Sequence, residues 1–181
     1  ALTKIQGAYS LIIMTNKKLI GVKDPYGIRP LVLGIKDGAY VLASETCAFD
    51  IIGAKYIRDI ENGEMVVITE SGVESIRLFS EHKERPCIFE RIYFARPDSI
   101  VDGQTVYTYR INLGKQLAKE SVVDADVIVP IPDSGVPAAI GYSQQSGTPF
   151  ELGIIRNHYI GRTFIEPSQS IRQFGVKLKH S

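Results

Sequence analysis

The spacing of turn-forming residues changes part-way along this sequence, and that change limits the folds open to the chain. Up to about Arg77, short apolar stretches alternate with turns rich in Gly, Asp, Asn and Pro, which is typical of antiparallel strands joined by hairpins. After the polar stretch SEHKERP at 80–86, segments with helical spacing alternate with short apolar runs, as in an α/β domain with a parallel sheet. We therefore expect an α+β domain at residues 1–84 and an α/β domain at residues 85–181.

Two hairpins and one helix are expected in the first half. The three-residue sequence KDG would join the second hairpin, with Gly at the end of the turn. Ser44 is a candidate N-cap for the helix, and Gly53 is a candidate stop. The strands of the hairpins are expected at 7–15, 19–22, 31–34 and 40–43. Together these elements predict an antiparallel meander with one helix.

The second half is expected to alternate helices and strands. The run Val127–Ile131 is short and continuously apolar, which indicates a strand buried on both faces of a parallel sheet. A helix of small residues follows it and is stopped by Gly147. The elements expected here are strands at 88–95, 127–131 and 152–155 and helices at 107–123 and 137–145.

The sequence PDSG joins the predicted strand at 127–131 to the helix after it. Ligands of open α/β sheets bind at the carboxyl ends of strands, and a helix N-terminus attracts anions. Asp133 offers a carboxylate, Ser134 a hydroxyl, and Gly135 allows close approach of the backbone. The alternative is a plain turn in which Asp133 or Ser134 only caps the helix. The local sequence leaves both interpretations open.

A basic stretch, RNHYIGRTF, follows the next predicted strand end. It brings Arg156, His158, Tyr159 and Arg162 together around a glycine. Guanidinium groups bind phosphate oxygens with two hydrogen bonds. The alternative is a solvated basic loop. Because two successive strand ends would line the same sheet edge, a phosphate site is favoured there.

Composition excludes several classes of protein. The net charge of +1 argues against a dedicated nucleic-acid binder, and no apolar run is long enough to span a membrane. No charged region followed by an apolar one opens the chain, so we expect no signal peptide. Cys47 and Cys87 are the only cysteines, which suggests a reducing compartment, and we expect a cytoplasmic protein. Cys47 is expected in the core, and neither cysteine has zinc-ligand spacing to other Cys or His residues.

An ordered set of motifs identifies a family. The motifs are GAYSLI, DPYGIRPLVLG, ASET, IYFARPDSIVDGQTVYTYRINLGKQLA, VIVPIPDSGVPAAIGY and ELGIIRNHYIGRTFIEPSQSIRQFGVKLK. With them the chain resembles, over nearly its whole length, glutamine phosphoribosylpyrophosphate amidotransferase, or amidophosphoribosyltransferase. The resemblance implies that residues 1–84 form the C-terminal part of an αββα N-terminal-nucleophile glutaminase domain. Residues 85–181 would form the first part of a type I phosphoribosyltransferase α/β domain.

The resemblance also implies an internal fragment of a longer enzyme. Ala1 does not match the nucleophilic N-terminal Cys of the family, and the glutamine-site motif HNG is absent. An acidic pair and a Thr-rich loop that grips the ribose 5-phosphate would follow Ser181. We therefore expect no catalytic residue in these 181 residues and no activity from them alone.

Site residues carry over from the family motif by motif. Asp133, Ser134 and Gly135 match the pyrophosphate loop, with Ser134 at the position associated with Mg²⁺, and this loop often holds a non-proline cis peptide. Cys87 matches the first of four ligands of a [4Fe–4S] cluster, which some members have and others lack. The residues that match the loop closing over phosphoribosyl pyrophosphate are Arg156, where Lys is frequent, Tyr159 and Arg162.

The implied reaction makes 5-phosphoribosylamine from phosphoribosyl pyrophosphate and glutamine, at the start of purine synthesis. Ammonia from glutamine would attack the ribose C1, and pyrophosphate would leave with inversion. Implied partners are these substrates, purine nucleotides as inhibitors and further copies of the chain, but no nucleic acid or membrane. One alternative is a stand-alone regulatory module that binds nucleotides or phosphate, and another is a structural piece that folds only with a partner.

Overall fold

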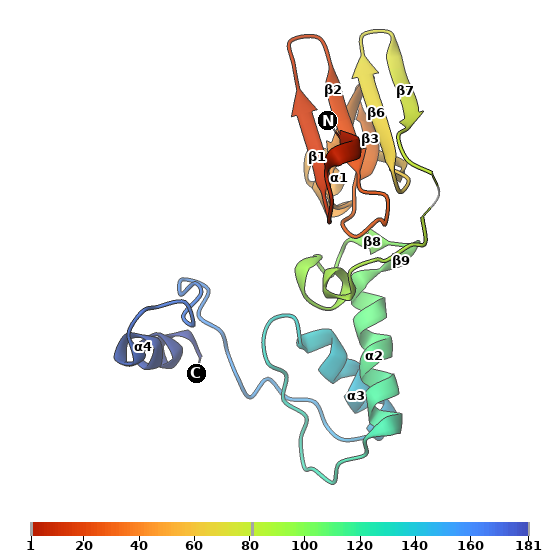
Figure 1. The fold of residues 1–181 in the computed structure, drawn as a ribbon. Coiled ribbons are helices and arrows are strands. Elements are labelled where there is room, and N and C mark those ends of the chain that lie inside the picture. The colour runs from red at the N-terminus through yellow and green to blue at the C-terminus, as the bar shows by residue number, and fades with distance from the viewer. Residues whose placement is uncertain (1, 81, 181) are drawn as a thin grey trace. The chain divides into compact units, whose positions relative to one another are not determined.

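The computed structural model describes residues 2–80 and 82–180, which fall into two compact units, Ala1–Val106 and Tyr107–Ser181 (Figure 1). The units divide later than residue 84 because the segment 85–87 still bonds to the first unit. The Arg85 N–H donates to the Tyr26 carbonyl (2.8 Å), and the Cys87 N–H donates to the Ile28 carbonyl (3.3 Å). The assignment of family domains to 1–84 and 85–181 stays a prediction.

The first unit contains two antiparallel sheets rather than one meander (Figure 1). One has the order β1-β2-β6-β7 and the other the order β4-β3-β5. The core cluster joins Leu33 of β3 to Val66 and Ile68 of β6, so the sheets bury their apolar residues against each other. The strands are β1 Ser10–Met14, β2 Leu19–Lys23, β3 Val32–Lys36, β4 Ala39–Ala43, β5 Lys55–Asp59, β6 Glu64–Thr69 and β7 Gly72–Arg77, and a short helix, η1, spans Leu2–Lys4.

Both predicted hairpins are confirmed, as β1–β2 and β3–β4. The three-residue connection predicted for the second is wrong. Lys36 pairs with Ala39, so only Asp37 and Gly38 form the turn. Both have positive φ, 49° and 82°, as a two-residue type I′ turn requires.

The helix of the first unit, α1 (Cys47–Ile52), packs on β3. Phe49 is buried against Gly34, where an added Cβ would lie 2.9 Å from the phenyl ring, so that position requires glycine. The stop at Gly53 is confirmed, with a left-handed φ of 69°. The N-cap predicted at Ser44 is wrong: Thr46 holds that position, without a capping side-chain hydrogen bond.

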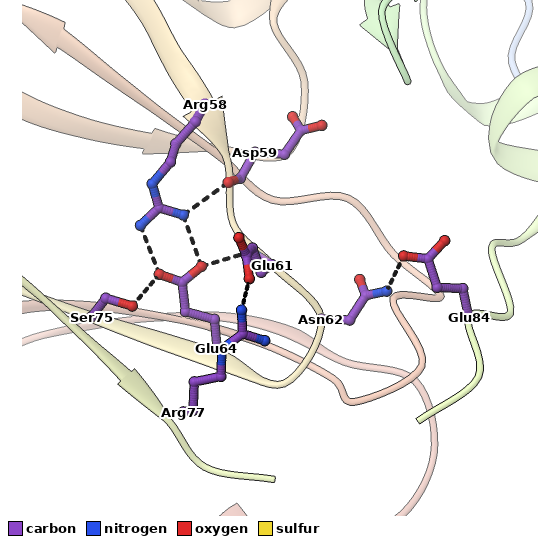
Figure 2. Close-up of polar contacts among 8 residues, drawn as sticks. All are labelled: Arg58, Asp59, Glu61, Asn62, Glu64, Ser75, Arg77 and Glu84. Atoms are coloured by element: carbon purple, nitrogen blue, oxygen red, sulfur yellow. Dashed lines mark hydrogen bonds and ion pairs between the residues drawn. The ribbon is translucent and has the colours of Figure 1, made fainter. Parts of the chain in front are cut away.

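An ion pair links the two sheets through Arg58 of β5 and Glu64 of β6 (Figure 2). The guanidinium donates to both carboxylate oxygens, at 2.8 and 2.7 Å. Ser75 of β7 and the Glu61 N–H also donate to Glu64, at 2.6 and 2.7 Å. Burial alone would raise the pKa of Glu64, which is 2% exposed, but these donors lower that pKa to about 2.

The segment before the second unit differs from its prediction. The strand predicted at 88–95 is wrong, because Glu90–Phe94 forms a π-helical turn, η2, closed by a bond from the Ala95 N–H to the Glu90 carbonyl. Glu90 is buried and pairs with Arg29 at 3.1 Å, so a charged side chain anchors a run that looked apolar. A small hairpin follows, made of β8 (Ile100–Val101) and β9 (Gln104–Thr105), where only a loop was expected.

The second unit is built on a close helix pair, α2 (Val106–Glu120) and α3 (Val136–Ser146). Both helices confirm their predictions, and Gly147 ends α3 with φ 79°. The backbones touch at two glycines. A Cβ on Gly114 would lie 1.9 Å from the Ala138 carbonyl oxygen, and one on Gly141 would lie 2.0 Å from the Ile111 carbonyl oxygen. This contact fixes α3 against α2.

The parallel sheet predicted for the second half is not formed by residues 82–180. The segments expected as strands at 127–131 and 152–155 contain no strand, and one parallel bridge joins Ile128 to Phe150. The Ile128 N–H bonds to the Pro149 carbonyl, and the Glu151 N–H bonds to the Ile128 carbonyl. A pair of extended segments without flanking strands is only marginally stable, which explains why pairing stops at one bridge.

A third helix in the second unit, α4 (Gln169–Lys179), was not predicted. The Ser168 hydroxyl caps it by accepting a bond from the Ile171 N–H. Ile171, Phe174 and Leu178 have the spacing of an apolar stripe, so the signal was present in the sequence. None of the helices in residues 2–80 and 82–180 has the length and apolar character needed to cross a bilayer.

Candidate functional site

The turn before α3 places Asp133, Ser134 and Gly135 at a helix N-terminus, as predicted. Gly135 occupies the N-cap position, and an added Cβ there would lie 2.6 Å from the Ile131 carbonyl oxygen, so the turn requires glycine. The expected non-proline cis peptide is present between Pro132 and Asp133. The turn is held by α3, which the glycine contacts fix against α2.

Two backbone donors of this turn are already used. The Gly135 N–H bonds to the Ile131 carbonyl (3.1 Å), and the Val136 N–H bonds to the Asp133 carbonyl (3.3 Å). An anion here would therefore depend less on these backbone groups than the sequence suggested. It would depend more on the field of α3, the Ser134 hydroxyl and nearby cationic side chains.

Arg156 lies against this turn. Its Nη1 is 2.5 Å from the Asp133 carboxylate, while the side chains of Arg156 and Asp133 remain 31% and 52% exposed. The Arg156 backbone is fixed as well, by a bridge to His180, and the adjacent Asn157 N–H donates to the Lys179 carbonyl (2.7 Å) at the end of α4. Of the predicted site residues, the structure thus joins Arg156 to the Asp133 turn.

Tyr159 and Arg162 are not part of this contact. The Tyr159 side chain is 98% exposed, and Arg162 is exposed too. Among the described residues, neither side chain makes a hydrogen bond or ion pair to the turn at 133–135. They lie in a segment anchored at Thr163, which is buried and packs on Gly175 of α4. The structure therefore places these two residues on an accessible loop.

The turn at 133–134 offers oxygen atoms of the kind that magnesium ions bind, namely the Ser134 hydroxyl and the Asp133 carboxylate. Mg²⁺ prefers hard oxygen ligands and is commonly held by one or two protein groups together with substrate phosphates. The Ser134 hydroxyl makes no hydrogen bond within residues 2–80 and 82–180, whereas the Asp133 carboxylate is paired with Arg156. No group of three His, Cys, Asp or Glu side chains in that part of the chain forms a metal site by itself.

The chain's own cysteines do not fit an iron–sulfur cluster. A [4Fe–4S] cluster takes four thiolates as a rule, and this sequence contains only Cys47 and Cys87. Cys47 is buried on α1, where burial raises the pKa of its thiol and so disfavours the thiolate. Cys87 lies at intermediate exposure, with its N–H bonded to the Ile28 carbonyl. Neither cysteine forms a disulfide, and together they supply at most two of the four thiolates that such a cluster takes.

A polar clamp in the first unit was missed by the sequence argument. The Glu45 carboxylate accepts bonds from the Arg96 N–H (2.8 Å) and the buried Ser99 hydroxyl (2.7 Å). The Thr46 hydroxyl accepts from the Ile100 N–H (2.8 Å). The motif ASET, treated as a helix start, thus holds the motif RPDS just before α2 begins. The only sequence signal for this clamp is that both motifs are rich in polar residues.

Comparison with known proteins decides the family resemblance. The model of a family described as "Glutamine amidotransferase domain" matches residues 1–50. The amidophosphoribosyltransferase of Rhizobium etli is 61% identical over 186 residues, which cover 100% of this chain and 38% of that protein. The amidophosphoribosyltransferase of Bacillus subtilis is 51% identical, with the same coverage of 100% and 38%. Over its whole length, this chain is similar to amidophosphoribosyltransferases.

Solved structures agree with the amidophosphoribosyltransferase match. One, described as glutamine phosphoribosylpyrophosphate amidotransferase from B. subtilis complexed with ADP and GMP, aligns with a TM-score of 0.90 at 51% identity, over 99% of this chain and 40% of that chain. Another, described as the allosteric regulatory enzyme of purine biosynthesis, aligns with a TM-score of 0.89 at 52% identity. The resemblance inferred from the motifs is confirmed, and the chain spans 38% of the length of each curated amidophosphoribosyltransferase named above.

Proposed function

We propose that this chain is the segment of an amidophosphoribosyltransferase that joins the glutaminase domain to the transferase domain and binds the pyrophosphate group of phosphoribosyl pyrophosphate. The complete protein would make 5-phosphoribosylamine for purine synthesis. The observation that carries the proposal is the turn at 133–135, placed at the N-terminus of α3 with Arg156 in contact. Identity of 61% over the whole chain to a curated amidophosphoribosyltransferase supports it.

The reaction places negative charge where these residues lie. A bond forms between the ammonia nitrogen and the ribose C1, the bond from C1 to the pyrophosphate oxygen breaks, and both its electrons leave with pyrophosphate. The new amine loses one proton. Arg156 and Arg162 would stabilise the leaving group by charge-assisted hydrogen bonds, and the N-terminus of α3 would add its field. Tyr159 lies on the same exposed segment and would help to cover the substrate.

A magnesium ion bound with the substrate would neutralise part of the charge on the diphosphate, with Ser134 as the protein group beside it. The other requirements of the enzyme lie outside these residues. The sequence contains neither the HNG motif nor the acidic pair and Thr-rich loop of the family. For the 181 residues alone we therefore expect weak substrate binding and no turnover.

Titration calorimetry with phosphoribosyl pyrophosphate and Mg²⁺ tests the proposal. We expect weak binding that Arg156→Ala abolishes, because it removes the cation at the turn. Lys119→Ala is the matched control, since Lys119 is an exposed cation in the last turn of α2. Equal binding by the wild type and Arg156→Ala would contradict the proposed site. Micromolar binding that is lost in Arg162→Ala would show that these residues suffice without the rest of the family site.

A stand-alone nucleotide-binding module is the second candidate. It is favoured by the description of one solved relative, which was studied with ADP and GMP. The same calorimetry with GMP separates the candidates. Binding of GMP without any binding of phosphoribosyl pyrophosphate would favour the module.

We also propose a homo-oligomer in a reducing, cytoplasmic setting. Two free cysteines support the reducing compartment. The edge strand β1 exposes Ile12, Ile13 and Met14, and an unpaired apolar edge favours association with another chain. Sedimentation equilibrium across a wide concentration range tests the association, and the mass of one chain throughout would contradict it.

A further inference from the structure

The contact between Asp133 and Arg156 joins two residues that the proposed function assigns to the same ligand. The Asp133 carboxylate lies 2.5 Å from the Arg156 Nη1, which is the place where a phosphate oxygen would bind. Both side chains are partly exposed, so a ligand can reach the pair. The carboxylate thus holds the position of an anion in the structure.

Arg156 cannot easily leave this contact by a backbone movement. Its own backbone bridges to His180, and the Asn157 N–H bonds to the Lys179 carbonyl. Its Nε is buried and has no hydrogen-bond partner among the described residues, so Asp133 satisfies only part of the guanidinium. An entering anion would therefore compete with Asp133 for an arginine that stays in place.

We infer that Asp133 is a specificity-determining residue, which competes for Arg156 and makes the site select diphosphate in its magnesium complex over the free anion. This inference rests on the proposed function. A free diphosphate must displace the carboxylate and then lie beside its negative charge. A diphosphate complexed with Mg²⁺ carries less charge, so it meets less repulsion from the same carboxylate.

A purely structural role for the pair gives the opposite expectation. If Asp133 only holds Arg156 in place, removing the carboxylate should make the arginine more mobile and weaken the binding of every anion. Asp133→Asn separates the two cases, because the amide oxygen still accepts a bond from Arg156 while the negative charge is gone. The structural role therefore predicts equal or weaker binding, and the competitor role predicts tighter binding of the free anion.

The experiment measures the affinity of the chain for inorganic pyrophosphate at pH 8, with EDTA and with excess Mg²⁺. Asp126→Asn is the matched control, since Asp126 is exposed and lies at the other end of the segment 126–133. We expect Asp133→Asn to bind magnesium-free pyrophosphate about tenfold more tightly than the wild type and Asp126→Asn do. The gain in affinity on adding Mg²⁺ should shrink by a similar factor. Circular dichroism checks that each variant is folded.

The outcomes separate this inference from the proposed function. Unchanged or weaker magnesium-free binding by Asp133→Asn, relative to Asp126→Asn, overturns the inference even if the wild type binds phosphoribosyl pyrophosphate with Mg²⁺. Tighter magnesium-free binding supports it, even if phosphoribosyl pyrophosphate itself is not bound and the proposed function fails. If no variant binds pyrophosphate under either condition, both are wrong. Arg156→Gln should abolish the tenfold gain when combined with Asp133→Asn, because the competition requires the arginine.

Discussion

The two compact units contrast in how far their own residues complete their structure. In the first unit, strands from two sheets bury a shared core, and an ion pair links the sheets. In the second, two helices pack closely, yet the segments before and after α3 pair at a single bridge. Apolar side chains of these segments stay accessible, with Ile131 67% and Leu152 58% exposed. Antiparallel hairpins find partners nearby in sequence, whereas a parallel sheet depends on strands far along the chain.

The contrast predicts that each unit has its own weak point. Gly114→Ala should give the largest effect, confined to the second unit. Its Cβ would meet the backbone carbonyl of Ala138 at 1.9 Å, so α2 and α3 must separate. We expect a loss of about 3 kcal/mol in stability, as in severe overpacking. Amide hydrogen exchange should show lost protection in α2 and α3 and unchanged protection in β2 and β6.

The control for this substitution is Gly161→Ala. Gly161 has no atom within 4 Å of an added Cβ, and its φ is not positive. Its replacement should leave protection of both units unchanged. If Gly114→Ala also lowers protection in β2 and β6, the two units do not unfold separately and the contrast fails.

Glu64→Gln should instead destabilise the first unit. It removes the charge that binds Arg58 and leaves the guanidinium only partly compensated, although that arginine is 37% exposed and can gain water. We expect a loss of about 2 kcal/mol, below the range for a fully buried pair. The midpoint of urea unfolding, monitored by hydrogen exchange of the amides in β2 and β6, measures this loss. Glu74→Gln, at an exposed position on β7, should have little effect.

The same carboxylate should make the first unit sensitive to acid. Its pKa falls from the ordinary 4.5 to about 2 in the folded chain. A depressed pKa stabilises the fold above the unfolded value, and that stability is lost as pH falls from about 4.5 toward 2. Stability measured across this range should decline less steeply in Glu64→Gln than in the wild type. Equal slopes would show that other carboxylates dominate.

The units also differ in how much the sequence predicted. Both hairpins, the stop at Gly53 and the helices α2 and α3 followed from turn residues and spacing, because each depends on neighbours in sequence. The division of strands between two sheets did not, since β2 pairs with β6 across forty-odd residues of chain. The predicted parallel strands did not form for the same reason: within the described residues, the run Val127–Ile131 pairs only at the bridge from Ile128 to Phe150.

The candidate site shows the same limit. Residues 133–135 could be placed at a helix N-terminus because PDSG and the small-residue helix are adjacent in sequence. The contact of Arg156 with Asp133 spans 23 positions and could be proposed only as a shared sheet edge. The clamp from Glu45 to Arg96 and Ser99 spans more than fifty, and no periodic pattern signals such a bond. Side-chain hydrogen bonds between distant loops produce no regular pattern of residues from which they could be predicted.

The smallest predicted effect concerns the turn between β3 and β4, whose conformation depends on residues adjacent in sequence. Asp37 has φ 49° and is followed by Gly38, an arrangement that Asn-Gly satisfies better than most pairs. Asp37→Asn should therefore stabilise the first unit by roughly 0.5 kcal/mol. Asp37→Ala should destabilise it, because alanine adopts a left-handed backbone less readily. Urea midpoints for the three proteins give the order Asn, Asp, Ala. If all three coincide, the turn does not limit the stability of its hairpin, and the contacts between the two sheets alone hold β3 and β4 together.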